Sequence, residues 1–167
     1  MNILVIQNRM GIGDMVIFLP FVKAISKKYN SPVTLLIKES TKANEYIDNI
    51  KYIKEIIYLK RDSKNNQHNG LTGFFKLKNE IKDRLFDKVF IFNSSLRYRL
   101  ICIIAGIKSI YQYPLFKKKG QHVIKAAQTL LKKISLEVES NPQIEIDKNS
   151  IKLAEQNLSI SKNKINI

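Results

Sequence analysis

Two apolar patterns alternate at the beginning of the chain. Residues 2–7 and 33–37 are largely continuous apolar runs, which are typical of strands buried on both faces of a sheet. Between them, apolar residues over 16–29 recur every three or four positions, which predicts a helix. Pro20 is expected in the first turns of this helix, where a missing N–H is tolerated, and residues 30–32 (Asn-Ser-Pro) would end it.

The alternation of strand and helix patterns continues beyond this opening. Further strands are predicted at residues 53–59, 89–92 and 109–111. Helices are predicted around residues 46–50, from 74 to about 85, from 94 to 105 and from 122 to about 134. Because strands separated by helices imply right-handed crossovers, the pattern predicts an α/β fold with a mainly parallel sheet of five strands.

The helix predicted from residue 74 has its apolar positions at Phe75, Leu77, Ile81 and Leu85. Phe74 and Phe75 are interpreted as core or loop-anchoring side chains rather than as a platform for a sugar. The helix predicted from residue 94 follows Asn93-Ser94-Ser95, in which either serine is suited to an N-cap.

Two segments follow neither pattern. Residues 60–73 are polar and contain two glycines, which predicts a loop. Residues 116–121 include Lys117, Lys118 and Lys119. We interpret this second segment either as a solvated basic turn or as part of an electropositive entrance for acidic sugars.

The sequence changes in character beyond Pro142. We expect a short extended piece at residues 144–146, a weakly amphipathic helix at 148–158 and the opening of a strand at 162–167. One domain is therefore predicted over residues 1–141, followed by a linker and the start of a further element over residues 142–167.

Composition supports a single folded domain, since 167 residues with 44% hydrophobic and 26% charged residues are typical of a globular chain. The N-terminus lacks the pattern of a signal peptide, and no apolar stretch approaches the length of a spanning helix, which favours a cytoplasmic protein. Cys102 lies in an apolar run and is expected to be a small buried hydrophobe, so disulfides and thiolate metal sites are not expected.

The chain is strongly basic. Its formal net charge is +15, from 29 Lys and Arg against 14 Asp and Glu, which favours anionic partners such as nucleic acid, an acidic membrane surface or an anionic glycan. Drift toward AT-rich codons would produce the same enrichment in Lys, Ile and Asn. The sequence contains no recognition-helix or aromatic-strand motif, so nucleic acid is the least favoured of these partners.

A glycine-containing loop, Arg9-Met10-Gly11-Ile12-Gly13-Asp14, joins the first predicted strand to the first helix. In an open parallel sheet this loop lies at the carboxyl edge, where ligands bind. The third glycine of a dinucleotide fingerprint would fall at Ile17, and no Gly-Lys-Ser/Thr follows. Asp14 would also place a negative charge where a pyrophosphate collects N–H donors. The loop is therefore not a dinucleotide cradle.

Asp14 is the main candidate for chemistry. The helix dipole favours an ionised carboxylate at a helix N-terminus. Such a group can remove the proton of an attacking sugar hydroxyl, and this contributes about 10²–10⁴-fold in rate. The alternative is that Asp14 only caps the helix, which contributes about 1 kcal/mol of stability.

Residues 2–6, the loop 9–14 and Pro20 together resemble the opening of glycosyltransferase family 9, the ADP-heptose:lipopolysaccharide heptosyltransferases. Three further stretches resemble family motifs in the same order: the Tyr-Asp strand, the Gly-Ser-x-Arg turn and the helix-opening His. They are Phe86-Asp87-Lys88-Val89-Phe90-Ile91, Ser94-Ser95-Leu96-Arg97 and Gln121-His122-Val123. The likeness extends over nearly the whole chain, although Ser94 stands where the family often has Gly.

This resemblance implies a Rossmann-like three-layer domain, the acceptor-binding N-terminal half of a GT-B fold. It implies inverting, metal-independent transfer of a sugar from a nucleotide-sugar, ADP-heptose, to a lipopolysaccharide core acceptor. The second domain, which would bind the nucleotide-sugar, is missing, so activity by this chain alone is not expected. The sequence has no Asp-x-Asp pair and no His/Cys cluster with ligand spacing, so neither a metal nor a cofactor is expected.

The resemblance also implies the roles of individual residues. Asp14 corresponds to the proposed catalytic base of the family. The residues predicted to bind the acceptor are Arg9, Met10, Gly11, Gly13, Ser94, Ser95, Arg97 and His122. The expected partners are an anionic glycolipid acceptor, a nucleotide-sugar donor bound through the missing domain, and peripherally the inner membrane surface.

Other interpretations of the sequence remain open. The serines could only cap their helix, Arg97 and Arg99 could be a solvated helix face, and His122 could serve packing. The whole chain could be a non-catalytic basic domain that binds anionic glycan or nucleic acid. It could also be an inactive gene fragment.

Overall fold

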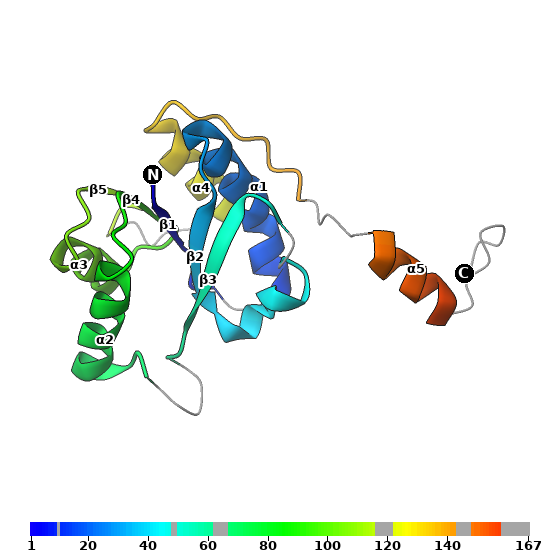
Figure 1. Cartoon of the computed structure of the whole chain (residues 1–167). Coiled ribbons are helices and arrows are strands. Elements are labelled where there is room, and N and C mark those ends of the chain that lie inside the picture. Colours follow the sequence, from blue (N-terminus) through cyan, green and yellow to red (C-terminus); the bar gives the residue numbers. More distant parts are fainter. Residues whose placement is uncertain (10, 48–49, 62–66, 116–121, 143–147, 158–167) are drawn as a thin grey trace.

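The computed structural model describes residues 1–9, 11–47, 50–61, 67–115, 122–142 and 148–157. Within these residues a five-stranded, fully parallel sheet forms the centre of the molecule (Figure 1). In spatial order its strands are β3 (Ile53–Leu59), β2 (Val33–Lys38), β1 (Ile3–Ile6), β4 (Lys88–Ile91) and β5 (Ser109–Gln112). The predicted α/β fold with a parallel sheet of five strands is therefore confirmed.

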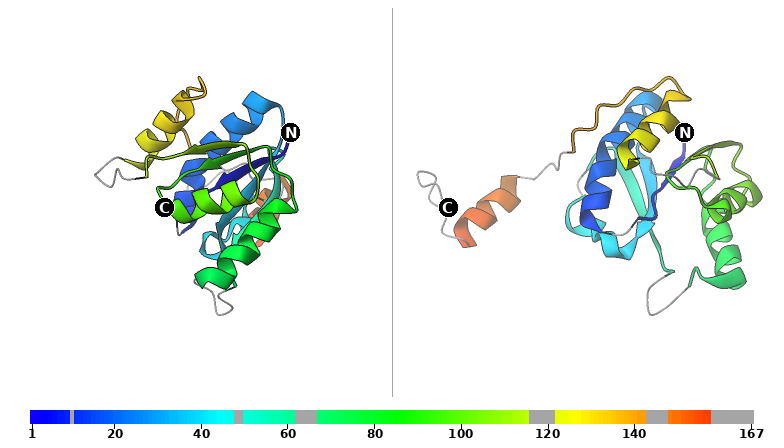
Figure 2. Two further views of the ribbon diagram at one scale, coloured as in Figure 1. Left: turned by 90° about the vertical axis from the view of Figure 1, so that its left-hand side faces the viewer. Right: turned by 180° about the vertical axis from the view of Figure 1, so that it is seen from behind.

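Helices cover both faces of the sheet, so the molecule has three layers (Figure 2, left). One face packs against α1 (Ile12–Tyr29) and α4 (Val123–Lys132), and the other against α2 (Gly70–Lys82) and α3 (Leu96–Ile104). Side chains alternate along β1, so Ile3 and Val5 enter the first core while Leu4 and Ile6 enter the second. The four residues of β1 are at most 1% exposed, as expected for the central strand of a doubly covered sheet.

One short connection differs from the prediction, and the helix predicted near the end of the chain is present. Two 3₁₀ turns, η1 (Glu39–Thr41) and η2 (Ala43–Glu45), precede the position where the sequence predicted a helical stretch at residues 46–50. The helix predicted at 148–158 is α5 (Lys148–Asn157), which Figure 1 shows apart from the three layers. The segments 116–121, 144–146 and 162–167 lie outside the described residues, as does Met10.

The prediction for Pro20 was wrong. Helix α1 begins at Ile12, directly after the glycine turn, so Pro20 is in the middle of an 18-residue helix rather than in its first turns. The apolar periodicity became visible only from Val16, because Gly13 and Asp14 at the start of the helix are not apolar. The helix accommodates a missing hydrogen bond at its centre.

The predicted loop at residues 60–73 was wrong at its end, because α2 already begins at Gly70. The side chain of Asn69 accepts a hydrogen bond from the backbone N–H of Gly70 at 3.0 Å and caps the helix. Gly73 is inside the helix and packs against the chain before it. A Cβ there would lie 2.6 Å from the Cα of His68. The glycine that indicated a loop is thus required by close packing.

The apolar face predicted for α2 was partly wrong. Leu77 and Ile81 are buried as expected, but Phe75 is 56% exposed and Leu85, beyond the helix, is 76% exposed. Leu77 and Ile81 follow Gly73 at the helical spacing of four, and this row faces the sheet. Phe75 and Leu85 belong to other faces of the segment.

Candidate active site

The sheet order creates a crevice at its carboxyl edge. The chain leaves β1 for α1 on one face and leaves β4 for α3 on the other, although β1 and β4 are hydrogen-bonded neighbours. The connections therefore diverge between these two strands, and ligands bind at such a topological switch point in open α/β sheets. The two segments that border it are residues 7–14 and residues 92–95.

Gln7, directly after β1, holds the first segment in place by hydrogen bonds. The residue is only 1% exposed, and its backbone N–H donates to the carbonyl oxygen of Leu36 at 3.0 Å. Its side-chain Oε1 accepts from the backbone N–H of Arg9 at 2.9 Å, which folds the chain back above the strand end. Gly11 then has φ 101° and ψ 154°, a conformation that is essentially restricted to glycine. The turn into α1 therefore requires Gly11.

Asp14 is the third residue of α1, and Gly11 occupies the N-cap position. Asp14 is therefore not the N-cap residue that the alternative interpretation required. Its side chain is 31% exposed, and its Oδ1 lies 3.8 Å from Nη1 of Arg9, whose side chain is 49% exposed. An exposed ion pair of this length contributes little stability. The pair can therefore separate at little cost, so that each side chain binds a ligand instead.

Gly13 leaves open space beside Asp14. A Cβ at Gly13 would have no atom within 4 Å, and its backbone does not have the positive φ that favours glycine. Neither packing nor backbone conformation explains a glycine in the first turn of a helix, where alanine would be more stable. The residue leaves the surface of the first helical turn open next to Asp14 in the sequence.

The second segment is held by amide side chains rather than by serine hydroxyls. Ser95 is the N-cap residue of α3, as expected, but its side chain makes no capping hydrogen bond. Instead, Oδ1 of Asn93 accepts from the backbone N–H of Ser95 at 2.9 Å. Nε2 of Gln112 donates to the carbonyl oxygens of Asn93 and Ser95 at 3.1 and 2.9 Å. Ser94 and Ser95 are partly exposed on this fixed turn.

Four buried polar atoms at this edge find no hydrogen-bond partner in the described part of the chain. They are Nε2 of Gln7, Nδ2 of Asn93, Oε1 of Gln112 and Oη of Tyr113. Gln112 ends β5, Gln7 and Tyr113 directly follow β1 and β5, and Asn93 lies two residues beyond β4. Because buried polar groups in folded proteins nearly always have partners, these four atoms make the edge a candidate for a polar ligand or ordered water.

Tyr113 links this cluster to the glycine turn. Its ring contacts that of Phe92 edge to face, with centroids 5.9 Å apart. Burial raises the pKa of the Tyr113 hydroxyl far above its ordinary value, and the nearby positive charge of Arg9 acts in the opposite direction. Tyr113 and Gln112 were missed by sequence reasoning. Their position directly at the end of a parallel strand was the signal that could have found them.

The structure places Arg97 differently from the other predicted residues. Its Nη2 donates to the carbonyl oxygens of His68 and Gly70 at 3.0 and 2.9 Å, and its guanidinium lies 5.4 Å from the ring centroid of Phe74. Desolvation, followed by the charge of Arg61, lowers the pKa of Arg97. Arg97 therefore joins α3 to the start of α2, away from Asp14 on α1.

His122 occupies the N-cap position of α4 and is exposed. Like α1, α4 begins at the carboxyl edge and covers the same face of the sheet. The structure thus brings the start of α4 to the same side as Asp14 and Tyr113.

Solved structures of other proteins have a similar fold. No protein-family model and no curated protein matches the chain. Among solved structures, a glycosyl transferase family 9 protein from Veillonella parvula DSM 2008 superposes with a TM-score of 0.74 at 17% identity, over 98% of this chain and 52% of that chain. E. coli ADP-heptose lps heptosyltransferase II gives 0.63 at 15% identity, over 97% and 52%. E. coli heptosyltransferase WaaC with ADP gives 0.54 at 10% identity, over 86% and 50%.

The chain has the fold of one half of a GT-B glycosyltransferase. It spans about half the length of each of these structures, which fits the N-terminal domain that the sequence motifs indicated. The resemblance stated from the sequence is thereby confirmed at the level of the fold.

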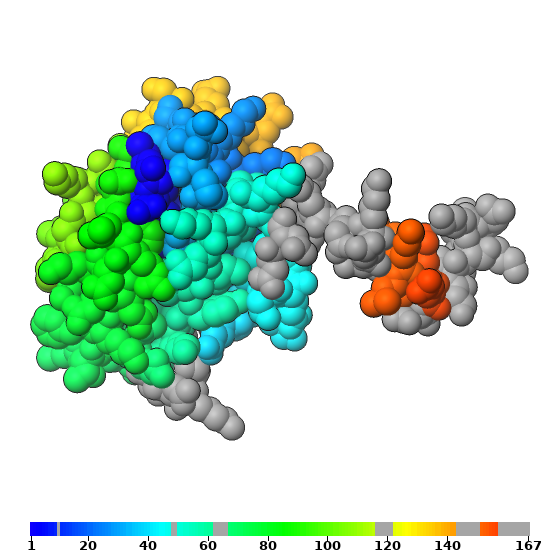
Figure 3. Space-filling model, in the orientation of Figure 1, coloured from blue at the N-terminus to red at the C-terminus, as the bar shows by residue number. Residues whose placement is uncertain are grey.

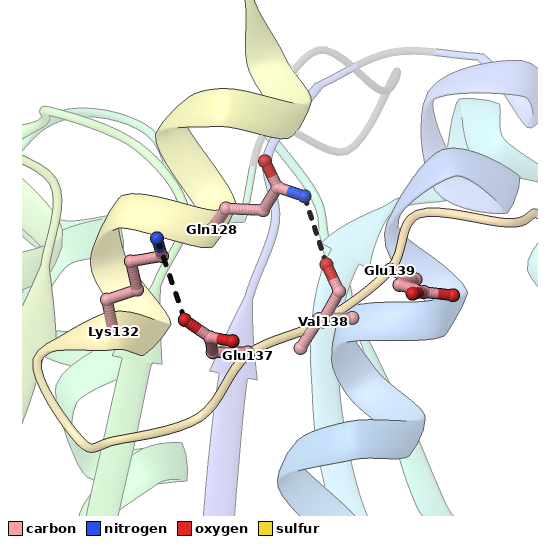
Figure 4. Close-up of a pocket in the computed structure, with 5 residues that line it drawn as sticks. All are labelled: Gln128, Lys132, Glu137, Val138 and Glu139. Carbon is pink, nitrogen blue, oxygen red and sulfur yellow. Dashed lines mark hydrogen bonds and ion pairs between the residues drawn. The ribbon is translucent and has the colours of Figure 1, made fainter.

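A hollow lies elsewhere, between α4 and the chain that follows it (Figure 4). It has a volume of about 500 Å³ and is lined by Gln128, Lys132, Glu137, Val138 and Glu139. Gln128 Nε2 donates to the carbonyl oxygen of Val138 at 3.0 Å, and Lys132 lies 3.7 Å from Glu137. None of the predicted site residues lines it.

The described residues contain no group of three or more His, Cys, Asp or Glu side chains that could hold a metal ion. Cys102 is buried in the second core, where desolvation raises its pKa to about 12. Among the described helices, none is long and apolar enough to cross a bilayer.

Proposed function

We propose that this chain is the acceptor-binding half of an inverting, metal-independent glycosyltransferase. The reaction is transfer of a sugar from a nucleotide-sugar, ADP-heptose, to a lipopolysaccharide core acceptor. The observation that carries this proposal is Asp14 in the first turn of α1 at the switch-point crevice, with open space at Gly13 beside it. The similarity in fold to heptosyltransferase structures supports it.

In this proposal Asp14 is the general base. The hydroxyl of the acceptor donates a hydrogen bond to the carboxylate, and its oxygen attacks the anomeric carbon of the donor sugar. The proton passes to Asp14 as the new C–O bond forms and the bond to the nucleoside diphosphate breaks. Attack from the side opposite the leaving group inverts the anomeric configuration.

The remaining residues orient the acceptor. Arg9 exchanges its weak ion pair with Asp14 for an anionic group of the sugar, because guanidinium binds carboxylate and phosphate through paired hydrogen bonds. Gly11 and Gly13 let the glycine turn pass closely under the sugar, and Met10, outside the described residues, is the third proposed acceptor-binding residue of this turn. Ser94, Ser95 and His122 supply hydrogen bonds from the two sides of the crevice. Arg97 holds the start of α2 through Nη2, which donates to two carbonyl oxygens, and its buried Nε, which has no partner among the described residues, donates to the acceptor in this proposal.

The nucleotide-sugar requires a second domain. We propose that residues 142–167 are the linker and the beginning of that domain, and that residues 1–141 alone bind the acceptor. The complete reaction then takes place in the cytoplasm, where the acceptor glycolipid stands on the inner membrane surface and the protein contacts that surface peripherally.

An Asp14→Asn variant tests this function. Residues 1–141 are fused to the C-terminal half of the Veillonella parvula glycosyl transferase, and transfer to core acceptor is followed by release of ADP. Turnover should fall by about 10²–10⁴-fold, while the dissociation constant of the acceptor changes little, because the amide keeps a hydrogen-bond acceptor but not the base. Asp83→Asn, at an exposed acid beyond α2, is the matched control and should retain the full rate. A wild-type rate for Asp14→Asn would remove Asp14 from the mechanism.

The net charge of +15 favours one alternative function, a non-catalytic basic domain for anionic glycan or nucleic acid. That alternative predicts binding to any nucleic acid sequence with a steep dependence on salt. The transferase proposal predicts acceptor binding that survives physiological salt and requires the crevice.

A further inference from the structure

The outer face of α2 and α3 exposes large apolar side chains that the fold does not require there. Six such residues, each between 41% and 79% exposed, lie on these two helices: Leu71 and Phe75 on α2, and Leu96, Leu100, Ile103 and Ile104 on α3. Isolated exposed apolar residues are ordinary, but a contiguous group marks an interaction surface. We call these six residues the α2–α3 patch.

The patch is continuous within each helix. On α2, Leu71 and Phe75 are one turn apart and lie on a different face from the buried Leu77 and Ile81. On α3, residues 96, 100, 103 and 104 follow the same helical spacing, opposite the buried Tyr98 and Ile101. Each helix is therefore apolar on its inner face and again on part of its outer face.

The two helices that carry the patch pack against each other. Arg97 donates to the carbonyl oxygen of Gly70 at 2.9 Å and lies over the ring of Phe74, so the first turns of α2 and α3 are in direct contact. Figure 2, left, looks onto these helices and shows them side by side. In Figure 3 the atoms of α2 lie on the open surface of the same flank.

Positive charge surrounds the patch. Lys78 and Lys82 continue the row of Leu71 and Phe75 along α2 at helical spacing. Arg99 is on α3 beside Leu100, and Lys108 follows the helix end.

The acidic residues of this region do not offset those charges. Glu80 points inward to His68, with Oε1 and Nε2 3.2 Å apart. Asp83 lies beyond the end of α2. Apolar side chains among Lys and Arg are the composition of helices that lie in the interface of an anionic membrane.

We propose that the α2–α3 patch docks the protein on an anionic lipid bilayer. The six apolar side chains enter the boundary between headgroups and acyl chains, and the neighbouring Lys and Arg side chains bind anionic headgroups. The helices lie on the surface, in keeping with the finding that no described helix could span a bilayer.

The patch would also orient the crevice. Both helices begin at the carboxyl edge of the sheet, so Leu71 and Leu96 lie at the same edge as Asp14. A protein docked through this flank holds that edge near the surface, where the sugars of a glycolipid acceptor stand. The inference names the surface for the peripheral membrane contact of the proposed function, on which the orientation also rests. Docking itself needs no acceptor and no catalysis, so it can be tested separately.

Vesicle co-sedimentation of the full 167-residue chain tests the docking. The probes are vesicles of phosphatidylcholine mixed with phosphatidylglycerol, and vesicles of phosphatidylcholine alone, both without any glycolipid acceptor. The chain should bind the anionic vesicles at least tenfold more tightly than the neutral ones, and added salt should weaken binding. Equal binding to both vesicles, or none, would overturn the proposal.

Paired variants locate the surface. Phe75→Ser with Leu100→Ser should weaken vesicle binding about tenfold or more, whereas Ile151→Ser with Leu153→Ser, equally exposed on α5, should not. Lys78→Glu with Lys82→Glu should weaken it by well over tenfold, and Lys27→Glu with Lys28→Glu at the end of α1 should weaken it much less, although the net charge changes equally. Circular dichroism confirms that each variant is folded.

Two further outcomes would overturn the proposal even if the patch proves to bind something. Equal losses in the patch variants and their controls would mean that net charge alone attracts the chain. Concentration-dependent dimers in light scattering that Phe75→Ser with Leu100→Ser abolishes, without vesicle binding by the wild type, would assign the patch to a second copy of the chain. Vesicle binding is measured without acceptor or transfer, so its result does not depend on whether Asp14→Asn affects transfer. The docking proposal and the proposed function can therefore fail separately.

Discussion

Two connections at the same edge of the sheet differ in whether their buried polar side chain is fully hydrogen-bonded. After β3, His68 is 2% exposed and has a partner at each ring nitrogen: the backbone N–H of Lys60 at 3.1 Å and Oε1 of Glu80 at 3.2 Å. After β1, Gln7 is equally buried but its Nε2 has no partner among the described residues. The buried histidine of the first connection is fully paired, whereas the buried glutamine of the second has an amide nitrogen left for another partner.

The glycines of the two connections show the same contrast. Gly73 is required because the chain at His68 packs directly against it. Gly13 has open space around it and an ordinary helical backbone. Where structure explains a glycine or a buried polar group, no function is needed. Where the structure does not explain such a residue, we infer that it contacts a ligand.

The largest effect on stability is expected at Gly73. In Gly73→Ala the new Cβ would lie 2.6 Å from the Cα of His68 and 2.9 Å from the carbonyl oxygen of Gln67, so backbone must move. The free energy of unfolding should fall by about 3 kcal/mol in urea titration, since overpacking outweighs the better helix propensity of alanine. An unchanged or increased stability would mean that this connection is not closely packed.

The matched change at Gly13 should have the opposite sign. Gly13→Ala meets no neighbouring atom and sits in a helix, so unfolding should cost about 0.5–1 kcal/mol more. The same methyl group would occupy the open surface that the proposed function gives to the sugar, so calorimetry should show weaker binding of core acceptor. A stabilised variant with unchanged acceptor affinity would separate Gly13 from the site.

Tyr113→Phe separates fold from function in the same way. The Tyr113 hydroxyl is buried without a described partner, so its removal should leave stability unchanged or raise it by up to about 1 kcal/mol. Acceptor affinity should fall, by about tenfold if the hydroxyl binds the ligand directly. A loss of stability without a loss of affinity would give Tyr113 a structural role instead.

The smallest effect is expected for an ion pair outside both connections. Nη2 of Arg84 and Oε1 of Glu55 are 2.8 Å apart, and the hydrogen bond from Arg84 lowers the pKa of Glu55. A lowered folded-state pKa stabilises the protein above the unfolded value and loses this contribution as pH falls through the folded value. Because both side chains are more than a third exposed, Glu55→Gln should cost less than about 1 kcal/mol at neutral pH. The difference from wild type should vanish in acid.

Sequence patterns predicted the sheet well because each strand can be identified from its own consecutive residues. Continuous apolar runs, such as that at β1, identify strands covered on both faces, and alternation with helices implies the parallel order. Helix starts were harder, since Gly11 and Asn69 determine where α1 and α2 begin through backbone conformation and capping. Such polar starts lie outside the apolar periodicity.

The site was predicted only in part. Asp14 and the glycine turn could be named from the sequence because a motif carries them in consecutive positions, and their role stays a prediction. The unpartnered Gln112 and Tyr113 were not found, since whether a buried polar atom has a partner depends on three strands meeting at one edge. The contacts of Arg97 with the start of α2 were missed for the same reason.

Acceptor is proposed to bind at the crevice between the ends of β1 and β4. An NMR titration of the isotope-labelled chain with lipopolysaccharide core oligosaccharide is the direct test. Backbone amide shifts should concentrate at Gly11, Gly13, Asp14 and Ser95, with little change at His68 on the β3–α2 connection. Shifts centred on the α4 hollow or on the β3–α2 connection, with none in the glycine turn, would contradict it.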